Sequence, residues 1–388
     1  MTSDRSPRVF HIITRLVVGG AQENTIHSCR GLKERGFDVT LVTGPEAGAE
    51  GSLLEEARAG GFRVIVLDSL RRDPRPIQDL RALYSLWTLF LREAPDIVHT
   101  HSSKAGILGR AAAWLAEVPL ILHTNHGLPF HADQPLLVNQ LWRLMEKIVA
   151  PATRKFLCVS EAMKRASVEA RLAPAGRHEI VYSGMEIPTL KDQARQRTEV
   201  RRRYLINETA PVVGWVGRMA PQKGPRDFLK VLGYLLERMP AARALWVGDG
   251  PLRPAIETEV HSLPGWDRIH FTGRIAPSEI PGHLAAMDVL ALTSFWEGLP
   301  RVAVQAALAG LPVVAYDVEG ASEIVRSGET GYLVPVGDRR GLAERVAEVL
   351  SLPDRGRAMG AKGREFVRDR FDGRRMIEAL VRVYGERR

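Results

Sequence analysis

The chain lacks the features that mark membrane-spanning and secreted proteins. No apolar run approaches the ~20 residues that a membrane-spanning helix needs, and the first residues contain no apolar core of a signal peptide. Cys29 and Cys158 are the two cysteines, and they lie far apart in apolar segments. Such sparse cysteines argue against a disulfide framework and favour a reducing compartment, so we expect a cytoplasmic protein.

Signatures of nucleic-acid binding are also missing, although the formal net charge is +9. The sequence contains no zinc-finger spacing, no RNP-type aromatic strand and no basic heptad region, so we expect no nucleic acid among the partners. Three interpretations of the positive charge stay open: arginines on a solvated surface, phosphate-bearing substrates, or an anionic membrane surface.

What the chain does contain is an alternation of short β-branched runs with longer amphipathic stretches. Its 388 residues, 45% hydrophobic and 26% charged, suffice for two globular domains of ordinary size. The alternation is typical of βα units with mostly parallel sheets. The first series predicts strands at Val9–Thr14, Asp38–Thr43, Arg63–Leu67, Ile97–Thr100, Leu120–Thr124, Phe156–Ser160 and Glu179–Tyr182, with helices such as Ala21–Arg35, Ile77–Arg92, Ala105–Ala116 and Leu136–Ala150.

A charged segment without strand pattern, Pro188–Arg203, separates this series from a second one. We interpret it as the crossing between two domains followed by a short basic helix. The second series predicts strands at Val212–Val216, Arg243–Val247, Ile269–Thr272, Val289–Thr293, Val313–Tyr316 and Tyr332–Pro335. The sequence therefore predicts two consecutive Rossmann-like halves with a cleft between them.

Two glycines, Gly19 and Gly20, follow the first predicted strand and open the first helix. Paired glycines let a backbone approach a ligand closely, and a helix N-terminus offers N–H groups to a phosphate. The pattern is not the Gly-x-Gly-x-x-Gly fingerprint of dinucleotide binding, and taken alone it is also typical of a tight connection.

A pair of histidines, His99 and His101, shares one face of the fourth predicted strand. A zinc site would use such a pair, but no acidic or cysteine ligand stands at a fitting spacing, so we predict no metal. A polar strand edge that faces the cleft is the favoured interpretation. Ser102 is expected to cap the following helix.

A second group of histidines follows the fifth predicted strand. His123, His126 and His131 lie within one short loop. A single loop histidine is more often structural or solvated, whereas three in so short a stretch are unusual for a simple connector. The loop is therefore a candidate for acid–base chemistry.

Two cations, Arg218 and Lys223, lie on the loop after the first strand of the second series. An arginine fork and a lysine point charge at this spacing would neutralise a diphosphate. Two solvated loop cations are the alternative, and the spacing alone does not decide between them.

Another strand end carries a single carboxylate. The apolar strand Val289–Leu292 runs into a loop with Glu297, and the turn Gly298–Pro300 then opens a small-residue helix that contains Gln305. Exposed N–H groups at such a turn are suited to hold an anion, and open α/β sheets bind their ligands at this edge. Taken alone, Glu297 would also fit an ordinary surface carboxylate.

Three elements, in this order, resemble one known family: Gly19–Gln22, the Gly-Arg-x4-Lys-Gly element Gly217–Gly224, and Glu297–Gln305. The last resembles the Glu-x7-Glu element of retaining nucleotide-sugar glycosyltransferases of the GT-B fold, glycosyltransferase family 4, with Gln305 in place of the second glutamate. The resemblance implies an α/β fold of two Rossmann-like domains facing across a cleft. It implies an acceptor-binding domain at residues 1–185, a domain at 186–370 that binds the nucleotide sugar, and a last helix, 371–388, that returns to the first domain.

The resemblance also implies roles for individual residues. It assigns binding of the sugar donor to Gly19, Gly20, Arg218, Lys223, Gly248, Arg274, Gly298, Leu299 and Gln305. It assigns catalytic roles to His126, as a supporting or acid–base group, and to Glu297, and acceptor binding to His101, Phe130 and His131. Because an amide cannot accept from both ribose hydroxyls as a carboxylate does, Gln305 is expected to weaken or alter nucleotide binding by ~1–3 kcal/mol.

The implied reaction is retaining transfer of a hexosyl group from a nucleotide diphosphate sugar, with UDP- favoured over GDP-, to an acceptor hydroxyl. The acceptor would belong to a bacterial surface glycan or a lipid-linked oligosaccharide. No Asp-x-Asp motif stands at the predicted site, which implies a metal-independent enzyme whose co-substrate, the nucleotide diphosphate sugar, replaces any cofactor. Two alternatives stay open: a nucleotide-sugar epimerase of related fold, and a non-catalytic nucleotide-sugar-binding or membrane scaffold protein.

Two amphipathic segments bear on where the acceptor is reached. Ile77–Phe90 is apolar over most of its circumference, and Leu136–Ala150 is followed by Arg154 and Lys155. Core packing is the favoured interpretation of both segments. The alternative is peripheral association with the anionic inner face of the cell membrane, where a lipid-linked acceptor would be available.

Overall fold

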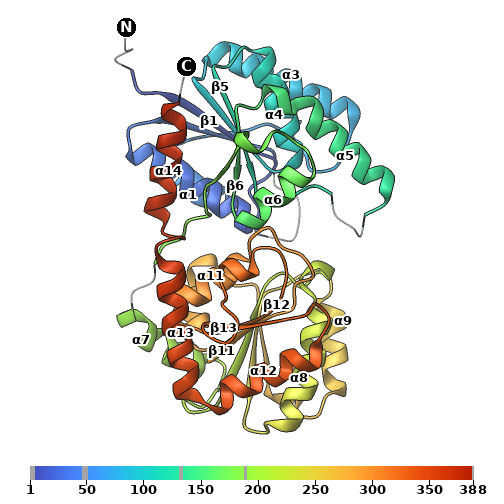
Figure 1. The fold of residues 1–388 in the computed structure, drawn as a ribbon, viewed down its shortest axis with the longest axis vertical. Coiled ribbons are helices and arrows are strands. Elements are labelled where there is room, and N and C mark those ends of the chain that lie inside the picture. Colours follow the sequence, from blue (N-terminus) through green and yellow to red (C-terminus); the bar gives the residue numbers. More distant parts are fainter. Residues whose placement is uncertain (1–4, 46–50, 131–133, 188–189, 387–388) are drawn as a thin grey trace. The chain divides into compact units, whose positions relative to one another are not determined.

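The computed structural model describes residues 5–45, 51–130, 134–187 and 190–386. It contains two compact units, drawn in Figure 1: Met1–Gly184 together with Gly373–Arg388, and Met185–Asp372. Each unit has its own parallel sheet and its own hydrophobic core. The predicted α/β architecture of two Rossmann-like halves is confirmed.

The first unit has a sheet of seven strands, all pairs of which are parallel, in the order β3-β2-β1-β4-β5-β6-β7. The strands are β1 (Arg8–Ile13), β2 (Asp38–Thr43), β3 (Arg63–Val66), β4 (Ile97–His101), β5 (Leu120–Asn125), β6 (Lys155–Cys158) and β7 (His178–Ile180). The chain builds outward from β1 to β3 and then places β4 on the other side of β1. The carboxyl ends of β1 and β4 therefore form the switch point at which such sheets bind ligands.

Helices cover both faces of this sheet. They are α1 (Gly20–Glu34), α2 (Leu54–Arg58), α3 (Pro76–Glu93), α4 (Ser103–Leu115), α5 (Leu136–Val149), α6 (Glu161–Glu169) and α14 (Gly373–Gly385), with short 3-10 turns η1 (Ala150–Ala152) and η2 (Ala175–Arg177). The last helix, α14, lies beside α1 (Figure 1). Gly31 permits this close approach, because a Cβ there would lie 2.5 Å from Cγ1 of Ile377. The C-terminal helix thus belongs to the first unit.

The second unit repeats the arrangement with six strands in the order β10-β9-β8-β11-β12-β13. The strands are β8 (Val212–Val216), β9 (Arg243–Val247), β10 (Ile269–Gly273), β11 (Val289–Leu292), β12 (Val313–Tyr316) and β13 (Gly331–Val334). All described pairs are parallel. Its switch point lies between the carboxyl ends of β8 and β11.

The helices of the second unit are α7 (Leu190–Arg203), α8 (Pro225–Arg238), α9 (Arg253–Glu259), α10 (Ile280–Ala285), α11 (Arg301–Leu308), α12 (Arg339–Ser351) and α13 (Pro353–Arg368). The short 3-10 turns are η3 (Pro221–Lys223), η4 (Val260–Ser262), η5 (Trp266–Arg268), η6 (Pro277–Glu279) and η7 (Ala321–Glu323). The basic helix expected after Pro188 is α7. Its Arg201 is fully buried and pairs with Asp288 at 2.9 Å, which fixes α7 on this unit.

Core packing describes only part of the two amphipathic segments. Helix α3 buries Leu86 and Phe90 in the core of the first unit. Helix α5 buries only Glu146 and Val149, and its large apolar residues Leu136, Leu137, Val138, Leu141, Leu144 and Ile148 are exposed. Core packing, the interpretation favoured from the sequence, is therefore wrong for most of the apolar face of α5.

Candidate active site

The switch point of the second unit brings together two residues predicted from separate motifs. Lys223, on the loop after β8, donates a hydrogen bond from Nζ to Oε1 of Glu297, on the loop after β11. The Glu297 side chain is only 9% exposed, whereas the Lys223 side chain is 27% exposed. The structure thus places one cation and one carboxylate in contact at the sheet edge where ligands bind.

Backbone and side-chain contacts hold these two loops against each other. Gly224 has a left-handed φ of 58°, and a Cβ there would collide with the carbonyl oxygen of Thr293. Thr293 in turn donates from Oγ1 to the carbonyl of Gly224 at 2.9 Å. Gln222 accepts from the N–H of Phe295 at 2.9 Å and donates from Nε2 to the carbonyl of Trp296 at 2.9 Å. Both sides of the Lys223–Glu297 contact are therefore fixed by the backbone.

Glycines bring the neighbouring strand ends to the same place. Gly248, after β9, has a φ of 127°, and a Cβ there would overlap the carbonyl oxygen of Gly217. Its N–H donates to the carbonyl of Gly273 at 3.0 Å. The two predicted arginines, Arg218 and Arg274, each follow one of these glycines and are exposed. The ends of β8, β9 and β10 thus form one continuous edge.

The turn after Glu297 leads directly into α11. Leu299 is buried, Gly298 is partly exposed, and Gln305 lies one turn into the helix with a partly exposed side chain. A cavity of about 10 Å³ lies behind Glu297 and is lined by Ser294, Tyr316 and other residues. Such a volume holds about one water, so the turn is packed closely from behind.

At the switch point of the first unit, Gly19 precedes α1 and Gly20 is its first residue. The carbonyl of Gly19 accepts from the N–H of Glu23 at 3.0 Å, and no side chain caps this helix. The N–H groups of the first turn therefore point toward the strand end, as phosphate binding would require.

The predicted cap of α4 is wrong. Ser102 has a φ of 61°, and its side chain makes no capping hydrogen bond. The N–H of Ala105 instead donates to Oγ1 of Thr14 at 3.2 Å, and the hydroxyls of Thr14 and Ser102 lie 2.9 Å apart. The hydroxyl of Thr14, just after β1, therefore caps α4 in place of the predicted Ser102.

Four histidines of this unit, His11, His99, His101 and His126, lie close together behind the strand ends. His101 is buried, and its two ring nitrogens lie 2.8 Å from Nδ1 of His11 and 3.1 Å from Nε2 of His126. His126 is partly exposed on the loop after β5. His101, predicted to bind the acceptor, therefore lies one hydrogen bond behind His126. Neither His11 nor its partner Tyr384 was singled out from the sequence.

Burial determines the charge of these rings. It lowers the pKa of His11 to about 3 and holds the pKa values of His99 and His101 well below 6.5. Neighbouring imidazoles lower the pKa values of His99 and His101 further. All three rings are therefore neutral near pH 7, with one N–H and one bare nitrogen each.

His11, His99 and His101 also present one ring nitrogen each within 4.8 Å of one another, a grouping that a metal ion could use. A tetrahedral zinc with bonds of roughly 2.0–2.1 Å would hold its nitrogens about 3.3 Å apart. Nδ1 of His11 and Nε2 of His101 lie closer than this, at hydrogen-bonding distance. The geometry favours a hydrogen-bonded cluster over a metal site.

The two remaining predicted acceptor residues lie on the loop after His126. Phe130 is buried against Ala170 and Leu172, and the guanidinium of Arg143 lies 4.5 Å from its ring centre. His131 lies outside the described residues. Acceptor contacts by both residues stay predictions.

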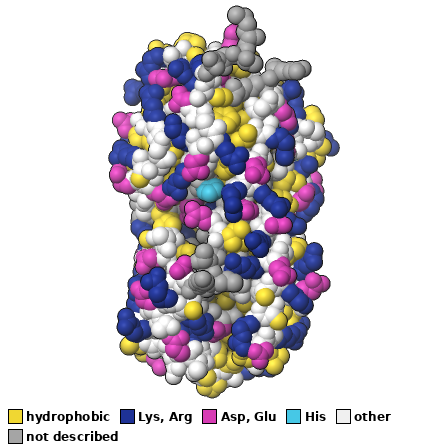
Figure 2. Space-filling view, turned by 90° about the vertical axis from the view of Figure 1, so that its left-hand side faces the viewer, with side chains coloured by type: hydrophobic (Ala, Val, Ile, Leu, Met, Phe, Trp, Pro, Cys, Tyr) yellow, Lys and Arg dark blue, Asp and Glu magenta, His cyan; other side chains and the backbone are white. Residues whose placement is uncertain are grey.

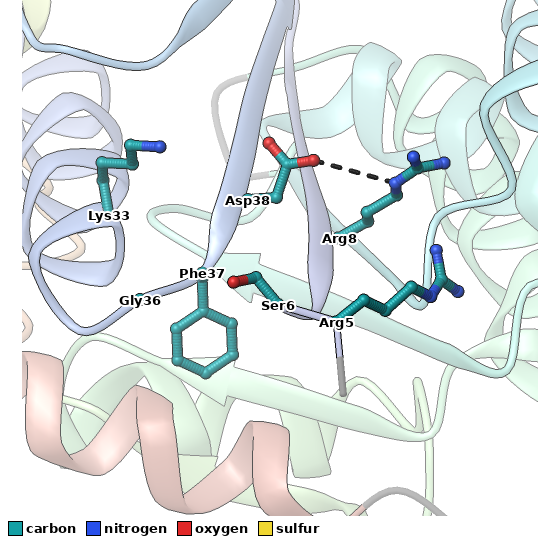
Figure 3. Close-up of a pocket in the computed structure, with 7 residues that line it drawn as sticks. All are labelled: Arg5, Ser6, Arg8, Lys33, Gly36, Phe37 and Asp38. Atoms are coloured by element: carbon teal, nitrogen blue, oxygen red, sulfur yellow. Dashed lines mark ion pairs between the residues drawn. The ribbon is translucent and has the colours of Figure 1, made fainter. Parts of the chain in front are cut away.

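A pocket at the opposite edge of the first sheet carries several cations (Figure 3). Its volume is about 410 Å³, and its lining includes Arg5, Arg8 and Lys33, which the close-up shows on either side of Asp38. Arg8 and Asp38 are the first residues of β1 and β2 and form an ion pair at 3.7 Å. Because ligands of open parallel sheets bind at the carboxyl ends of the strands, this pocket is separate from the candidate site.

The net positive charge is not gathered on the face that Figure 2 shows. Lys and Arg side chains alternate there with Asp and Glu side chains over the whole surface in view. Solvent-accessible ion pairs are also found among the described residues, for example Arg203–Glu279 at 3.1 Å and Arg355–Glu348 at 2.9 Å. Over this face, the solvated-surface interpretation of the charge is the one that fits.

Comparison with known proteins identifies the family. A model described as "Glycosyl transferase 4-like domain" matches residues 19–184, and one described as "Glycosyl transferases group 1" matches residues 196–366. The 2-deoxystreptamine N-acetyl-D-glucosaminyltransferase of Streptomyces fradiae is 31% identical over 365 residues, which cover 88% of this chain and 84% of that protein.

A second relative is the UDP-Gal:alpha-D-GlcNAc-diphosphoundecaprenol alpha-1,3-galactosyltransferase of Escherichia coli, 28% identical over 343 residues that cover 85% of this chain and 84% of that protein. Among solved structures, Anabaena HepE in complex with UDP-glucose superimposes with a TM-score of 0.81 at 20% identity, covering 97% of this chain and 99% of that one. With two parallel sheets and matches to both halves, the chain belongs to the glycosyltransferases of family 4 and has the GT-B fold.

Proposed function

We propose that the protein is a retaining hexosyltransferase that moves a sugar from a UDP-sugar to a hydroxyl of a lipid-linked or surface-glycan acceptor. The observation that carries this proposal is the contact between Lys223 and Glu297 at the switch point of the second unit. It joins a group suited to a diphosphate with a group suited to sugar hydroxyls, within a chain that belongs to a glycosyltransferase family.

In this proposal the second unit holds the sugar donor. Lys223 and Arg218 neutralise the diphosphate as it becomes the leaving group, which is the main electrostatic contribution. Glu297 accepts hydrogen bonds from hydroxyls of the transferred sugar. In the structure Lys223 and Glu297 pair with each other. Gly248 and Arg274 line the nucleotide side.

We propose that the nucleotide of the sugar donor is UDP. The E. coli relative is named for a UDP-sugar, which favours UDP over GDP for this chain. Gln305 takes the ribose position with an amide, so its hydrogen bonds to the diol differ from those of a carboxylate. We assign no enzyme nucleophile: the acceptor attacks on the face from which the diphosphate leaves, and the two cations take the place of a metal ion.

The first unit then supplies the acceptor side. In this proposal His126, which is partly exposed on its loop and backed by His101, takes the proton of the attacking hydroxyl or orients that hydroxyl. Gly19 and Gly20 present helix N–H groups at the neighbouring strand end, where a phosphate of either substrate would be stabilised.

Helix α5 supports a membrane-bound acceptor. Among the described residues, no helix combines the length and hydropathy that a bilayer crossing requires. Leu137, Leu141, Leu144 and Ile148 nevertheless lie on one helical face and are 56–79% exposed. Exposed Arg143 and Lys147 flank this stripe. We therefore propose that α5 docks on the anionic inner face of the cell membrane.

Vesicle binding tests the docking. Full-length protein should sediment with vesicles that contain anionic lipid and should be released by salt. Leu141→Asp should weaken binding about tenfold, because burying a leucine is worth about 1.5–3 kcal/mol. Leu205→Asp changes an exposed leucine of the second unit and serves as the control. Equal binding by both variants would rule out α5 as the docking element.

Nucleotide release tests the reaction. The protein is incubated with UDP- and GDP-sugars, with and without an undecaprenyl-diphosphate-linked N-acetylglucosamine acceptor, and the product is analysed by NMR for its anomeric configuration. We expect acceptor-dependent UDP release and retained configuration. Glu297→Gln should abolish most turnover, whereas Glu237→Gln, on the exposed side of α8, should not.

The same assay separates the alternatives. Interconversion of the free nucleotide sugar without an acceptor would indicate an epimerase. Nucleotide binding without turnover across the full panel of donors and acceptors would indicate a scaffold. Either result would contradict the proposed transfer.

A further inference from the structure

Six side chains of the first unit form one continuous hydrogen-bonded path that starts at the candidate catalytic loop. Its links are His126 Nε2 to His101 Nδ1 at 3.1 Å, His101 Nε2 to His11 Nδ1 at 2.8 Å, His11 Nε2 to the Tyr384 hydroxyl at 3.2 Å, that hydroxyl to His99 Nδ1 at 2.6 Å, and His99 Nε2 to Thr124 Oγ1 at 2.7 Å. We call these six side chains the imidazole chain. They come from β1, β4, β5, the loop after β5 and α14.

The middle of the imidazole chain is buried from solvent and uncharged. His11, His99, His101 and Tyr384 are each no more than 1% exposed. Burial lowers the pKa of each of the three imidazoles and raises the pKa of the Tyr384 hydroxyl, so all four groups are neutral near pH 7. A neutral imidazole donates from one nitrogen and accepts at the other.

This property makes the hydrogen bonds depend on one another. Each buried ring uses both nitrogens within the chain, so a ring that accepts on one side must donate on the other. Reversing one link would set two N–H groups, or two bare nitrogens, against each other unless every link reverses. The imidazole chain therefore has two consistent arrangements, one directed from His126 toward Thr124 and one directed the opposite way.

The two bonds of Tyr384 indicate which arrangement is present. Hydrogen bonds donated by a hydroxyl are shorter than those donated by a ring N–H. The short 2.6 Å contact fits Tyr384 donating to His99, and the longer 3.2 Å contact fits His11 donating from Nε2 to Tyr384. His11 Nδ1 is then bare, His101 donates to it, and His126 donates from Nε2 to His101.

We propose that the imidazole chain sets which ring nitrogen of His126 carries the proton, holding it on Nε2 so that Nδ1 is a base. Tyr384, on the last helix, is then a positioning residue that acts on His126 through His11 and His101. The inference rests on the proposed function, which places His126 beside the acceptor hydroxyl. It adds that the C-terminal helix completes the acid–base group of the first unit.

Three ionisable groups near the imidazole chain, Cys29, His123 and Arg110, are either neutral or paired. Cys29, on α1 near Tyr384, is buried, and its pKa is raised by burial, so the thiol is protonated. His123, on β5, is neutral because burial lowers its pKa, and it bonds to Thr100 at 2.8 Å. Arg110, on α4, is paired with Glu146 at 2.6 Å. None of these three groups places an uncompensated charge beside the imidazole chain.

NMR on full-length protein labelled with ¹⁵N-histidine tests the proposal directly. Long-range ¹H–¹⁵N correlations report which nitrogen of each ring is protonated, and N–N couplings across hydrogen bonds report the His126–His101 and His101–His11 links. We expect Nε2–H forms for His126, His101, His11 and His99, and both couplings. Nδ1–H forms of these histidines, or the absence of the N–N couplings, would overturn the proposal. So would stoichiometric binding of added Zn²⁺ by these rings.

Tyr384→Phe should reverse the chain. The variant leaves His11 Nε2 without an acceptor, and a bare buried nitrogen is tolerated better than a buried N–H without a partner. The proton of His11 moves to Nδ1, His101 follows, and His126 switches to its Nδ1–H form. Tyr204→Phe is the matched control, because Tyr204 contacts a ring nitrogen of His283 in the second unit. An unchanged His126 in folded Tyr384→Phe would overturn the role of Tyr384.

Kinetics separate this proposal from the proposed function. Tyr384→Phe should lower kcat by much of the roughly 10²–10⁴-fold that an acid–base group contributes, because Nδ1 of His126 then carries the proton, and it should leave KM for the sugar donor unchanged. A switched His126 with unchanged kcat would overturn the positioning role. A wild-type protein that shows the expected tautomers but transfers no sugar would contradict the proposed function alone. If Tyr384→Phe does not fold, the wild-type spectra still decide the direction of the chain.

Discussion

The two units present the same kind of sheet edge and fill it with opposite chemistry. In the second unit, the switch point between β8 and β11 holds an ion pair, Lys223 with Glu297. In the first unit, the switch point between β1 and β4 is backed by buried, neutral imidazoles. One topology thus supports charge neutralisation at one edge and a group kept uncharged at the other.

The difference follows from what each half is proposed to bind. A nucleotide diphosphate carries its own negative charge, so cations at the strand ends stabilise it before and during departure. An attacking hydroxyl is neutral, and a base that serves it works best when it is not already protonated. Burial behind His126 lowers the pKa values of His11, His99 and His101 and so keeps these supporting rings neutral.

Acid should affect the two units unequally. For His11, His99, His101 and His123 the folded-state pKa lies below 6.5, so the unfolded chain takes up protons first as the pH falls. The stabilisation from these neutral histidines is fully present above pH 6.5. It is lost progressively as the pH falls toward their folded-state pKa values, by up to about 1.4 kcal/mol per pH unit for each histidine.

Hydrogen exchange at pH 7, 6 and 5, corrected for intrinsic rates, should show that the first unit loses protection at a higher pH than the second unit. The pKa values of the partly exposed His270 and the buried His283 of the second unit are also lowered by burial, but by less. If the second unit lost its amide protection at a higher pH than the first, the proposed difference between the two units would be contradicted.

Removing the cation should disable the charged site. Lys223→Ala is expected to lower kcat about 10²–10³-fold, because one preorganised group that stabilises the leaving diphosphate is lost. Lys230→Ala removes an exposed lysine from α8 of the same unit and is the control. Turnover with saturating donor and acceptor is the measurement. Similar rates for both variants would show that Lys223 does not contact the diphosphate.

Placing a carboxylate at position 305 should increase the affinity of the same site for the nucleotide. Gln305→Glu is expected to tighten UDP binding about tenfold, since a carboxylate accepts from both ribose hydroxyls. Gln305→Asp adds the same charge on a shorter side chain that does not reach the diol and should give no gain. Titration calorimetry with UDP measures both. Weaker binding of Gln305→Glu would mean that Gln305 does not face the ribose.

The smallest expected effect concerns the cap of α4. Thr14→Ala should destabilise the protein by about 1 kcal/mol, because the N–H of Ala105 loses its side-chain acceptor. Ser102→Ala should cost less, since Ser102 makes no capping bond. Urea unfolding, followed separately in the two units, measures the difference. A larger loss for Ser102→Ala would reverse the assignment.

Patterns along the chain predicted most of the fold. Strands β2, β8, β9 and β12 have the bounds that the β-branched runs indicate, because a buried parallel strand is apolar over its whole length. The sequence predicts the motifs of Lys223 and Glu297 at the ends of two strands, and these strands, β8 and β11, are neighbours in the sheet. The ion pair itself could not be read from the sequence, since it depends on strand order and loop conformation.

The imidazole chain could not be predicted from the sequence, because its contacts depend on which strands and helices are neighbours. His11 faces His99 only because β1 pairs with β4 in the register that places those two residues opposite each other. Tyr384 reaches both rings because α14 returns over a sequence separation of more than 280 residues. Periodicity reports the buried face of a strand or helix but not its neighbour. The same limit explains α5, whose apolar face resembled a core face.

The most direct test of the account is where a nucleotide binds. Hydrogen exchange of the full-length protein with and without saturating UDP should show protection at residues 217–224 and 293–301, the loops that carry Lys223 and Glu297. The pocket of Arg5, Arg8 and Lys33 at the opposite edge of the first sheet should show no change. Protection confined to that pocket, with none at the two loops, would contradict the assignment of the second unit as the site of the sugar donor.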